Sequence, residues 1–391
     1  MNLILFDGIE RDQLLPLTFT RPMGLLRWGI LTIAEKWEKD MGIHPSFRTV
    51  EYLQNKYPHI PAGLNLYVNG GLCPNSELMN ALLELQDGQA LIANDAILGL
   101  MSTQAWEEVD LPSGIEKIEF SGNFRLCSFP WQLFSENAEE LEYDFDRLTK
   151  GRESAEIARS NTVLGGRIFL EPSASVEAST LNASTGSIYV GEGASILEGC
   201  MVRGGLALGE HSQLKMGAKI YGATTLGPHC KGGGEINNSI LFGYSNKGHD
   251  GFLGNAVLGE WCNLGADTNN SNLKNNYDEV KIWSYVQKKF ISTGQQFCGL
   301  IMGDHSKSGI NTMFNTGTVI GVSSNIFGSG FPRNYIPSFS WGGAAGLSVY
   351  RFDKAMETAE RMMNRRGIEL DFIEREILQE VQRLNGEGQS N

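Results

Sequence analysis

Hydrophobic positions in the middle of the chain recur every six residues. The aliphatic side chains in this series are Val190, Ile196, Val202, Leu208, Leu214, Ile220 and Leu226. Four positions after each stands Ala194, Cys200, Leu206, Ser212, Ala218, Thr224 or Cys230, and all but Leu206 are small. A period of six fits neither one face of an α-helix nor the simple alternation of a strand. It predicts a β-helix in which the aliphatic residues fill the interior and the small residues fit the corners.

The six-residue phase is interrupted twice. It breaks near residues 232–234, resumes at Phe252, Leu258 and Leu264, breaks again, and returns at Phe314, Ile320 and Ile326. Breaks of this kind predict loops that leave the coil on one side, where binding sites often lie. A glycine-rich linker or an all-β sandwich is the alternative, but seven consecutive positions in phase favour the β-helix.

The two ends of the chain have different patterns. Apolar runs at 3–6 and 66–68 predict strands, and helical spacing at 29–39 and 76–85 predicts helices between and after them. Alternating strands and helices indicate an α/β domain. Residues 136–157 are acidic and then basic, which predicts a connecting helix, and the charged amphipathic pattern of 352–384 predicts terminal helices. We therefore expect an α/β domain over 1–150, a β-helix over 151–345 and a helical tail over 346–391.

Composition limits the classes of partner. The net charge of −13 argues against nucleic acid as the main ligand. The six cysteines show no CxxC pair, which favours free thiols in a reducing compartment. The first residues read as a buried strand, not as a signal peptide, and no run of 18 apolar residues is present. These features predict a cytoplasmic protein that does not bind a membrane.

The coil around residue 249 carries the first set of candidate functional residues. Residues 214–264 resemble the left-handed β-helix acyltransferases, and among them the bifunctional N-acetylglucosamine-1-phosphate uridylyltransferase/glucosamine-1-phosphate acetyltransferases. In that family a histidine stands three positions before an aromatic residue and fourteen before an asparagine, which here are His249, Phe252 and Asn263. Lys215 takes the place of the arginine that binds the sugar phosphate. The resemblance implies a left-handed parallel β-helix, acetyl-CoA as a substrate and a homotrimer.

The residue types in this coil suit acetyl transfer. A base must take a proton as the sugar amine attacks the thioester, and a neutral imidazole such as that of His249 does so near pH 7. Lys215 is expected to hold the substrate phosphate, and Asn263 and Asn276 to orient the sugar or the imidazole, with Phe252 beside them. Backbone N–H groups near Ala266 are expected to bind the acyl carbonyl or the pantetheine arm of acetyl-CoA. His305 is the reserve candidate for the base.

A second set of candidates lies near the N-terminus. Residues 5–27 resemble the phosphate-binding loop of sugar nucleotidyltransferases, which implies a nucleoside triphosphate and Mg²⁺ as ligands. The nucleotide-binding residues carried over are Gly8, Arg11, Arg21 and Arg27. Met23 stands where the family has a lysine, and residues 66–71 end in glycine where the family has a magnesium-binding aspartate. Asp7 and Asp95 are candidate metal ligands, although the sequence does not define the metal site.

The sequence as a whole predicts a bifunctional enzyme of sugar-nucleotide synthesis. It would transfer an acetyl group from acetyl-CoA to an amino-sugar 1-phosphate such as glucosamine 1-phosphate, and a nucleotidyl group from a nucleoside triphosphate to a sugar 1-phosphate. Two alternatives stay open. One is a nucleotidyltransferase whose β-helix only oligomerises or regulates. The other is a non-catalytic scaffold that binds sugar nucleotides.

Overall fold

The computed structural model describes residues 1–107 and 110–389, which form two compact units. The first unit comprises Met1–Leu14, Thr20–Leu26 and Leu31–Phe129. The second comprises Leu15–Phe19, Arg27–Ile30 and Pro130–Asn391. Helices α4 (Pro130–Ser135) and α5 (Asn137–Thr149) thus belong to the second unit, whereas the sequence pattern grouped them with the first domain.

The first unit is an α/β domain with a mixed sheet in the order β2-β1-β3-β6-β5-β7. Strand β1 pairs in parallel with β2 and β3, β6 runs antiparallel to both β3 and β5, and β7 is parallel to β5. The strands are β1 (Asn2–Phe6), β2 (Ser46–Arg48), β3 (Asn65–Asn69), β5 (Gln89–Ala93), β6 (Ala96–Ser102) and β7 (Glu116–Glu119), and β4 (Leu72–Cys73) pairs separately with β8 (Arg125–Leu126). The expected α/β class of this unit is confirmed.

Local signals explain where the helices of the first unit begin. Helix α1 (Ile33–Met41) begins after Thr32. The Thr32 hydroxyl accepts a hydrogen bond from the Glu35 amide, and the Glu35 carboxylate accepts one from the Thr32 amide. That capping box explains why the helix starts four residues later than the expected residue 29. Helix α3 (Ser76–Leu83) starts after the Asn75 cap and confirms the predicted helix there. The remaining helical segments are short: α2 (Glu51–Gln54), η1 (Arg11–Leu14) and η2 (Met23–Leu25).

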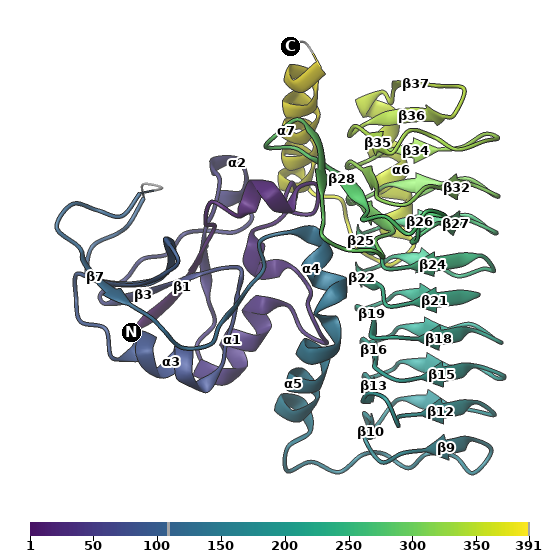
Figure 1. Cartoon of the computed structure of the whole chain (residues 1–391), viewed down its shortest axis with the longest axis horizontal. Coiled ribbons are helices and arrows are strands. Elements are labelled where there is room, and N and C mark those ends of the chain that lie inside the picture. Colours follow the sequence, from purple (N-terminus) through teal and green to yellow (C-terminus); the bar gives the residue numbers. More distant parts are fainter. Residues whose placement is uncertain (108–109, 390–391) are drawn as a thin grey trace. The chain divides into compact units, whose positions relative to one another are not determined.

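The second unit contains the expected parallel β-helix, whose coils are stacked in Figure 1. In the described residues it has three faces. Face 1 consists of β10 (Ile168–Leu170), β13 (Ile188–Val190), β16 (Leu206–Leu208), β19 (Thr224–Leu226), β22 (Ile240–Gly243), β25 (Val257–Glu260), β30 (Leu300–Met302), β33 (Thr318–Ile320) and β35 (Tyr335–Ile336).

Faces 2 and 3 are built in the same way. Face 2 consists of β11 (Ser175–Val176), β14 (Ser195–Ile196), β17 (Gln213–Leu214), β20 (Lys231–Gly232), β23 (Asn246–Lys247), β26 (Asn263–Leu264), β31 (Lys307–Ser308), β34 (Asn325–Ile326), β36 (Ser340–Gly343) and β37 (Gly346–Val349). Face 3 consists of β9 (Thr162–Leu164), β12 (Thr180–Asn182), β15 (Met201–Arg203), β18 (Lys219–Tyr221), β21 (Glu235–Asn237) and β24 (Phe252–Gly254). Strands β27 (Asn269–Asn270) and β32 (Met313–Phe314) form a separate pair in the later coils.

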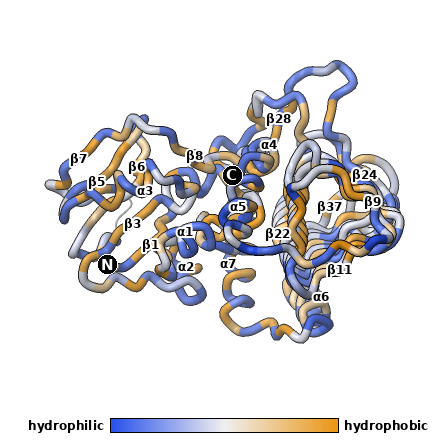
Figure 2. The backbone as a smooth tube through the Cα atoms, turned by 90° about the horizontal axis from the view of Figure 1, so that it is seen from below, coloured by the Kyte–Doolittle hydropathy of each residue, from blue (hydrophilic) through white to orange (hydrophobic). Residues whose placement is uncertain are grey.

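The interior of the coils is apolar, because the six-residue series lines it. Figure 2 views the coils from their end, with the backbone coloured by hydropathy. Every member from Val190 to Leu226 is at most 1% exposed. The phase expected at Phe252 is wrong, because Leu253 is the interior residue and pairs with Ile236 of the previous coil. The corner between Leu253 and Leu258 is one residue short, so counting back six positions from Leu258 reaches the wrong side chain.

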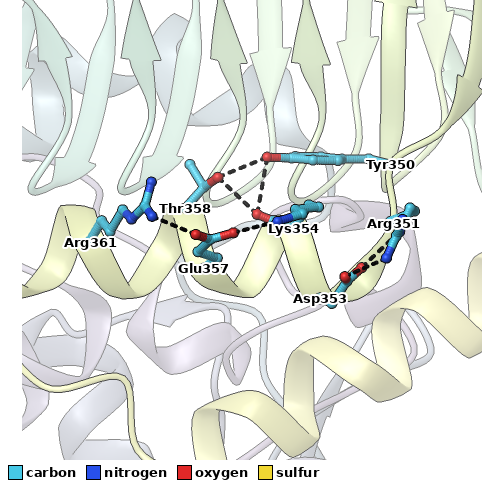
Figure 3. A network of polar contacts seen from close by, with 7 residues as sticks. All are labelled: Tyr350, Arg351, Asp353, Lys354, Glu357, Thr358 and Arg361. Atoms are coloured by element: carbon cyan, nitrogen blue, oxygen red, sulfur yellow. Dashed lines mark hydrogen bonds and ion pairs between the residues drawn. The ribbon is translucent and has the colours of Figure 1, made fainter.

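Helices cover part of the β-helix. Apolar residues of α6 (Phe352–Asn364) and α7 (Phe372–Gln389) pack with Trp261, Val322 and Phe339 at the corner between faces 1 and 2. Figure 3 shows polar contacts along α6, where the Tyr350 hydroxyl meets Thr358 and Glu357 contacts Lys354. None of the helices in the described part of the chain combines the length and the apolar character needed to cross a bilayer.

Candidate functional site

Of the nucleotide-binding residues expected near the N-terminus, Gly8 and Arg11 lie at the carboxyl edge of the parallel strands β1, β2 and β3. Asp7 directly follows β1 and is buried at the centre of this edge. Its carboxylate accepts hydrogen bonds from the Met23 amide (2.8 Å) and the Thr49 hydroxyl (2.5 Å), and it forms an ion pair with Arg11 (3.2 Å). Burial raises the pKa of Asp7, and Arg11 is the first of the groups that oppose this rise.

Arg11 is held on several sides. Besides Asp7, its guanidinium contacts the Asp12 carboxylate (2.8 Å) and donates to the Tyr52 hydroxyl (3.0 Å). Arg21 is also buried, at 4% exposure. These cations are therefore part of the packed edge of the domain, and a phosphate would have to compete with the carboxylates for Arg11.

Gly8 and Met23 explain how closely this edge is packed. A Cβ atom on Gly8 would lie 2.3 Å from a Glu10 carboxylate oxygen and 2.7 Å from the Asn69 amide nitrogen. Met23, at the position of the family's lysine, is fully buried, and its side chain lies against Gly70 and Gly71. The space beside the expected phosphate loop is thus occupied by protein side chains.

Arg27 is not grouped with the other nucleotide-binding candidates, because it belongs to the second unit. Its guanidinium is buried, with the Nε atom donating to the Phe242 carbonyl oxygen (3.0 Å) and an Nη atom donating to the Ile30 carbonyl oxygen. These contacts tie the segment Arg27–Ile30 to the β-helix. The short spacing of six residues between Arg21 and Arg27 did not indicate that the two arginines belong to different units.

The candidate metal ligands Asp7 and Asp95 have different surroundings. The Asp7 oxygens are already engaged by Arg11, Thr49 and Met23, and Asp95 is an exposed residue of the β5–β6 turn with φ of 66°. No group of three His, Cys, Asp or Glu side chains suited to a metal occurs within residues 1–107 and 110–389. All six cysteines are buried free thiols.

The acetyl-transfer candidates fall at the corner between faces 2 and 3 of the β-helix. His249 is exposed there, in the loop between β23 and β24. Lys215 follows β17 at the same corner, two coils earlier, and the coil between them carries Gly233 and Gly234. Neighbouring strands are about 4.8 Å apart, so the two backbone positions are separated by about 10 Å, within reach of one sugar phosphate and a lysine side chain.

Asn263 and Phe252 flank His249 on the two faces that meet at this corner. Asn263 lies on face 2, where its amide oxygen accepts a bond from Asn246 (3.4 Å), and Phe252 lies on face 3 beside Glu235. Ala266 lies at the same corner one coil later, and its carbonyl oxygen accepts from the Asn311 amide (2.8 Å). The β-helix therefore brings together residues that span positions 215 to 266.

Face 2 also carries a cluster of positive charge next to Lys215. Lys231 pairs in register with Gln213, which accepts a bond from the Lys215 ammonium (2.5 Å). Burial lowers the pKa of Lys231, and the positive charges of Arg366, Lys215 and Arg365 lower it further. Lys231 is therefore close enough to each of these three cations to be repelled by it. Arg366 also donates to the carbonyl oxygen of His229 (3.2 Å). Such a cluster in a chain of net charge −13 is suited to an anion.

Two expected residues lie elsewhere. Asn276 belongs to the excursion that leaves the coil between β27 and β30, at the corner between faces 3 and 1, and its amide bonds Asp278. The excursion carries a hairpin of β28 (Lys281–Ser284) and β29 (Lys289–Ser292). His305 is buried at the corner between faces 1 and 2, in a stack of rings with Trp261, Tyr244, His229 and His211. Neither residue joins the His249 corner.

Sequence reasoning missed Lys247, two residues before His249. This lysine occupies an interior position of face 2, in register with Gly232, and is 1% exposed. Its ammonium donates to the carbonyl oxygens of Gly233 (3.0 Å), His249 and Asp250 (3.2 Å). The available signal was a charged residue in the interior series that runs from Leu214 and Gly232 to Leu264, but the phase break concealed that position.

Comparisons with known proteins show a likeness in the N-terminal segment. Residues 3–153 match the family model described as sugar nucleotidyl transferase, which confirms the resemblance expected for this segment. A bifunctional sugar-1-phosphate nucleotidylyltransferase/acetyltransferase of Sulfurisphaera tokodaii is 32% identical over 93 residues, which are 24% of this chain and 23% of that protein. A bifunctional protein GlmU of Methanococcus aeolicus is 31% identical over 90 residues, 23% of this chain and 21% of that protein.

The two alignments cover a small part of this chain and a small part of each relative. The chain spans less than a quarter of the length of each of these two curated relatives. Among solved structures, the polySia-specific acetyltransferase NeuO aligns with 54% of this chain and 99% of its own length, at 14% identity and a TM-score of 0.29. A TM-score of 0.29 at this identity supports no functional comparison.

Proposed function

We propose, taking the match of residues 3–153 to sugar nucleotidyl transferases as a premise, that this protein is a bifunctional enzyme of sugar-nucleotide synthesis. Its β-helix would acetylate an amino-sugar 1-phosphate with acetyl-CoA, and its first unit would bind a nucleoside triphosphate for nucleotidyl transfer. The observation that carries the proposal is that Lys215 and His249 share the corner between faces 2 and 3, with Asn263 on the adjoining face 2, one coil beyond His249. We further propose that the protein works as a cytoplasmic homotrimer.

The proposed acetyl transfer assigns each residue at the corner a task. The neutral imidazole of His249 accepts a proton from the sugar amine as the amine nitrogen attacks the thioester carbonyl. The C–N bond forms, the C–S bond breaks, and the CoA thiolate leaves. Lys215, with Lys231 beside it, holds the phosphate of the acceptor, so that the amine is delivered to His249. Asn263 and Phe252 bound the sugar on either face, and backbone N–H groups near Ala266 receive the acyl oxygen.

The proposed nucleotide site is the edge that carries Gly8, Arg11 and Arg21. For Arg11 to bind a phosphate it must give up part of its pairing with Asp7 and Asp12. Arg27 is left out of this proposal, because its donors are used by carbonyl oxygens within the second unit.

A second candidate function is an acetyltransferase whose first unit keeps the sheet without transferring nucleotides. The burial of Met23 against Gly70 and Gly71, together with the double carboxylate pairing of Arg11, favours it. Titration of the purified protein with UTP, TTP and CTP in the presence of Mg²⁺ separates the two. Heat of binding for one of the three supports the bifunctional proposal, and no heat with any of them leaves only the acetyltransferase.

Acetyl transfer itself is tested by incubating the protein with acetyl-CoA and a panel of amino-sugar 1-phosphates. We expect one acceptor to gain the mass of an acetyl group, while free thiol appears in equal amount. Matched acceptors whose amine is already acetylated serve as controls and should release no thiol. If no acceptor in the panel gains mass, the proposed activity of the β-helix is wrong.

A further inference from the structure

Lys247 is a charged residue inside a core of apolar side chains. The corresponding interior positions of face 2 carry Val176, Ile196, Leu214, Leu264 and Ile326, each at most 3% exposed, and the uncharged Gly232 and Ser308. Removing an ammonium from water costs several kcal/mol, whereas an apolar side chain at this position would stabilise the coil. Apolar packing of the β-helix therefore gives no reason for a lysine here, and the reason must lie in the contacts of its ammonium.

The contacts of the ammonium all lead to the loop that carries His249. Its three N–H donors are matched by three carbonyl oxygens, those of Gly233, His249 and Asp250. Two of these oxygens belong to the loop, and the third belongs to the coil beneath it. The lysine thus connects the loop to the preceding coil within the interior of the β-helix. Its acceptors in the loop are backbone oxygens, so substitution of a side chain in the loop does not remove them.

The coil beneath is shaped to receive the loop. A Cβ atom on Gly233 would lie 2.6 Å from the Gly248 carbonyl oxygen, and one on Gly234 would lie 2.7 Å from the His249 carbonyl oxygen. Only glycine therefore lets the loop approach this closely. The two glycines and the ammonium together determine where the His249 backbone lies.

We propose that Lys247 is a positioning residue for acetyl transfer, whose buried ammonium holds the His249 loop so that the imidazole faces the acceptor amine. This inference rests on the proposed function of the corner. Lys247 does not touch the substrate and acts through the backbone of residues 249 and 250.

The arrangement gives the loop a dependence on pH. Burial lowers the pKa of Lys247 to about 8, while Asp250 and Asp267 oppose the change. As the pH rises through this value the ammonium becomes an amine with two N–H donors, so that one of the three bonds and the positive charge are lost. Acetyl transfer should then fall above pH 8.

Global stability should change in the opposite direction. The pKa of Lys247 is lower in the folded chain than the ordinary value of 10.5, so between about pH 8 and 10.5 the unfolded chain binds more protons. Its contribution to stability therefore rises with pH in this window. A lysine that merely supported the fold would make activity and stability change together.

The test compares Lys247→Met with Ile196→Met, a control at the same interior position of face 2 in an earlier coil. For K247M we expect a folded protein with a lower Tm, because three carbonyl oxygens lose their donor. We also expect a kcat for acetyl transfer lower by about 10–100-fold, a KM for the acceptor changed less than about 3-fold, and no fall in kcat above pH 8. Hydrogen exchange at the amides of residues 248–251 should be faster. The I196M variant should keep the parental kcat, pH profile and exchange.

The outcomes separate this proposal from the one on which it rests. A K247M protein that keeps the parental kcat and the parental fall in acetyl transfer above pH 8 would overturn the positioning role. If the unsubstituted protein transfers no acetyl group, the proposed function fails, and hydrogen exchange alone tests whether Lys247 holds the loop. Faster exchange at 248–251 in K247M supports that role, and unchanged exchange refutes it. If K247M does not fold, the unsubstituted chain is measured from pH 7 to 9, where protection of these amides must fall through pH 8.

Discussion

Replacement of His249 by alanine is the most direct test of the proposed acetyl transfer. The imidazole is the proposed acceptor of the amine proton, and no other histidine lies at the same corner among the described residues. His211, His229 and His305 are stacked at the corner between faces 1 and 2. His44 and His59 belong to the first unit. We therefore expect no neighbouring imidazole to substitute for the missing one.

The size of the effect follows from the general base and from the exposure of the side chain. Loss of a positioned base lowers the rate by about 10²–10⁴-fold, equivalent to about 3–5 kcal/mol of transition-state stabilisation. The folded state should lose little. The imidazole is exposed, and the bond that fixes residue 249 to Lys247 uses the backbone carbonyl, which alanine retains. The change in the free energy of unfolding should stay within about 0.5 kcal/mol.

The assay follows release of the CoA thiol with saturating acetyl-CoA and the acceptor found by mass. His211→Ala is the matched control, because it removes an exposed imidazole from another corner of the same β-helix and should keep the parental kcat. Thermal unfolding of both variants should overlap that of the parent. An H249A protein that is folded and retains more than a tenth of the parental rate would refute the base assignment.

Three further predictions concern the surrounding structure. Lys215→Met removes a cation from the proposed phosphate site, so it should raise the KM for the sugar phosphate by about 10-fold or more with a smaller effect on kcat. Lys219→Met on face 3 is the control. Arg27→Met should lower the free energy of unfolding by about 2–4 kcal/mol in chemical denaturation, since it leaves the buried carbonyl oxygens of Phe242 and Ile30 without this donor; unchanged stability would contradict that reading. Light scattering at micromolar concentration should give a mass of about three chains of 43.0 kDa, and a monomer mass would end the trimer proposal.

The sequence by itself determined the parts of the fold that repeat or are local. Interior positions of a β-helix recur at a fixed period, so Val190 to Leu226 could be assigned without knowledge of the third dimension. The same holds for α3 after its Asn75 cap and for β1 with its run of apolar residues. For the candidate site, the family resemblance carried by His249, Phe252 and Asn263 predicts one acetyl-transfer corner, and the His249 variant tests that prediction.

Only the tertiary structure decided which residues share a site when the repeat is interrupted or the partners are far apart in sequence. Counting by six placed Phe252 in the interior and concealed Lys247, because corners one or two residues short shift the phase without leaving a mark in composition. Asn276 is thirteen positions from Asn263 but leaves the coil at a different corner, and Arg27 is six positions from Arg21 but packs in the other unit. Such distances depend on where the chain turns, and the turns are fixed by contacts between coils, such as the Lys247 ammonium on the carbonyl oxygens of two of them.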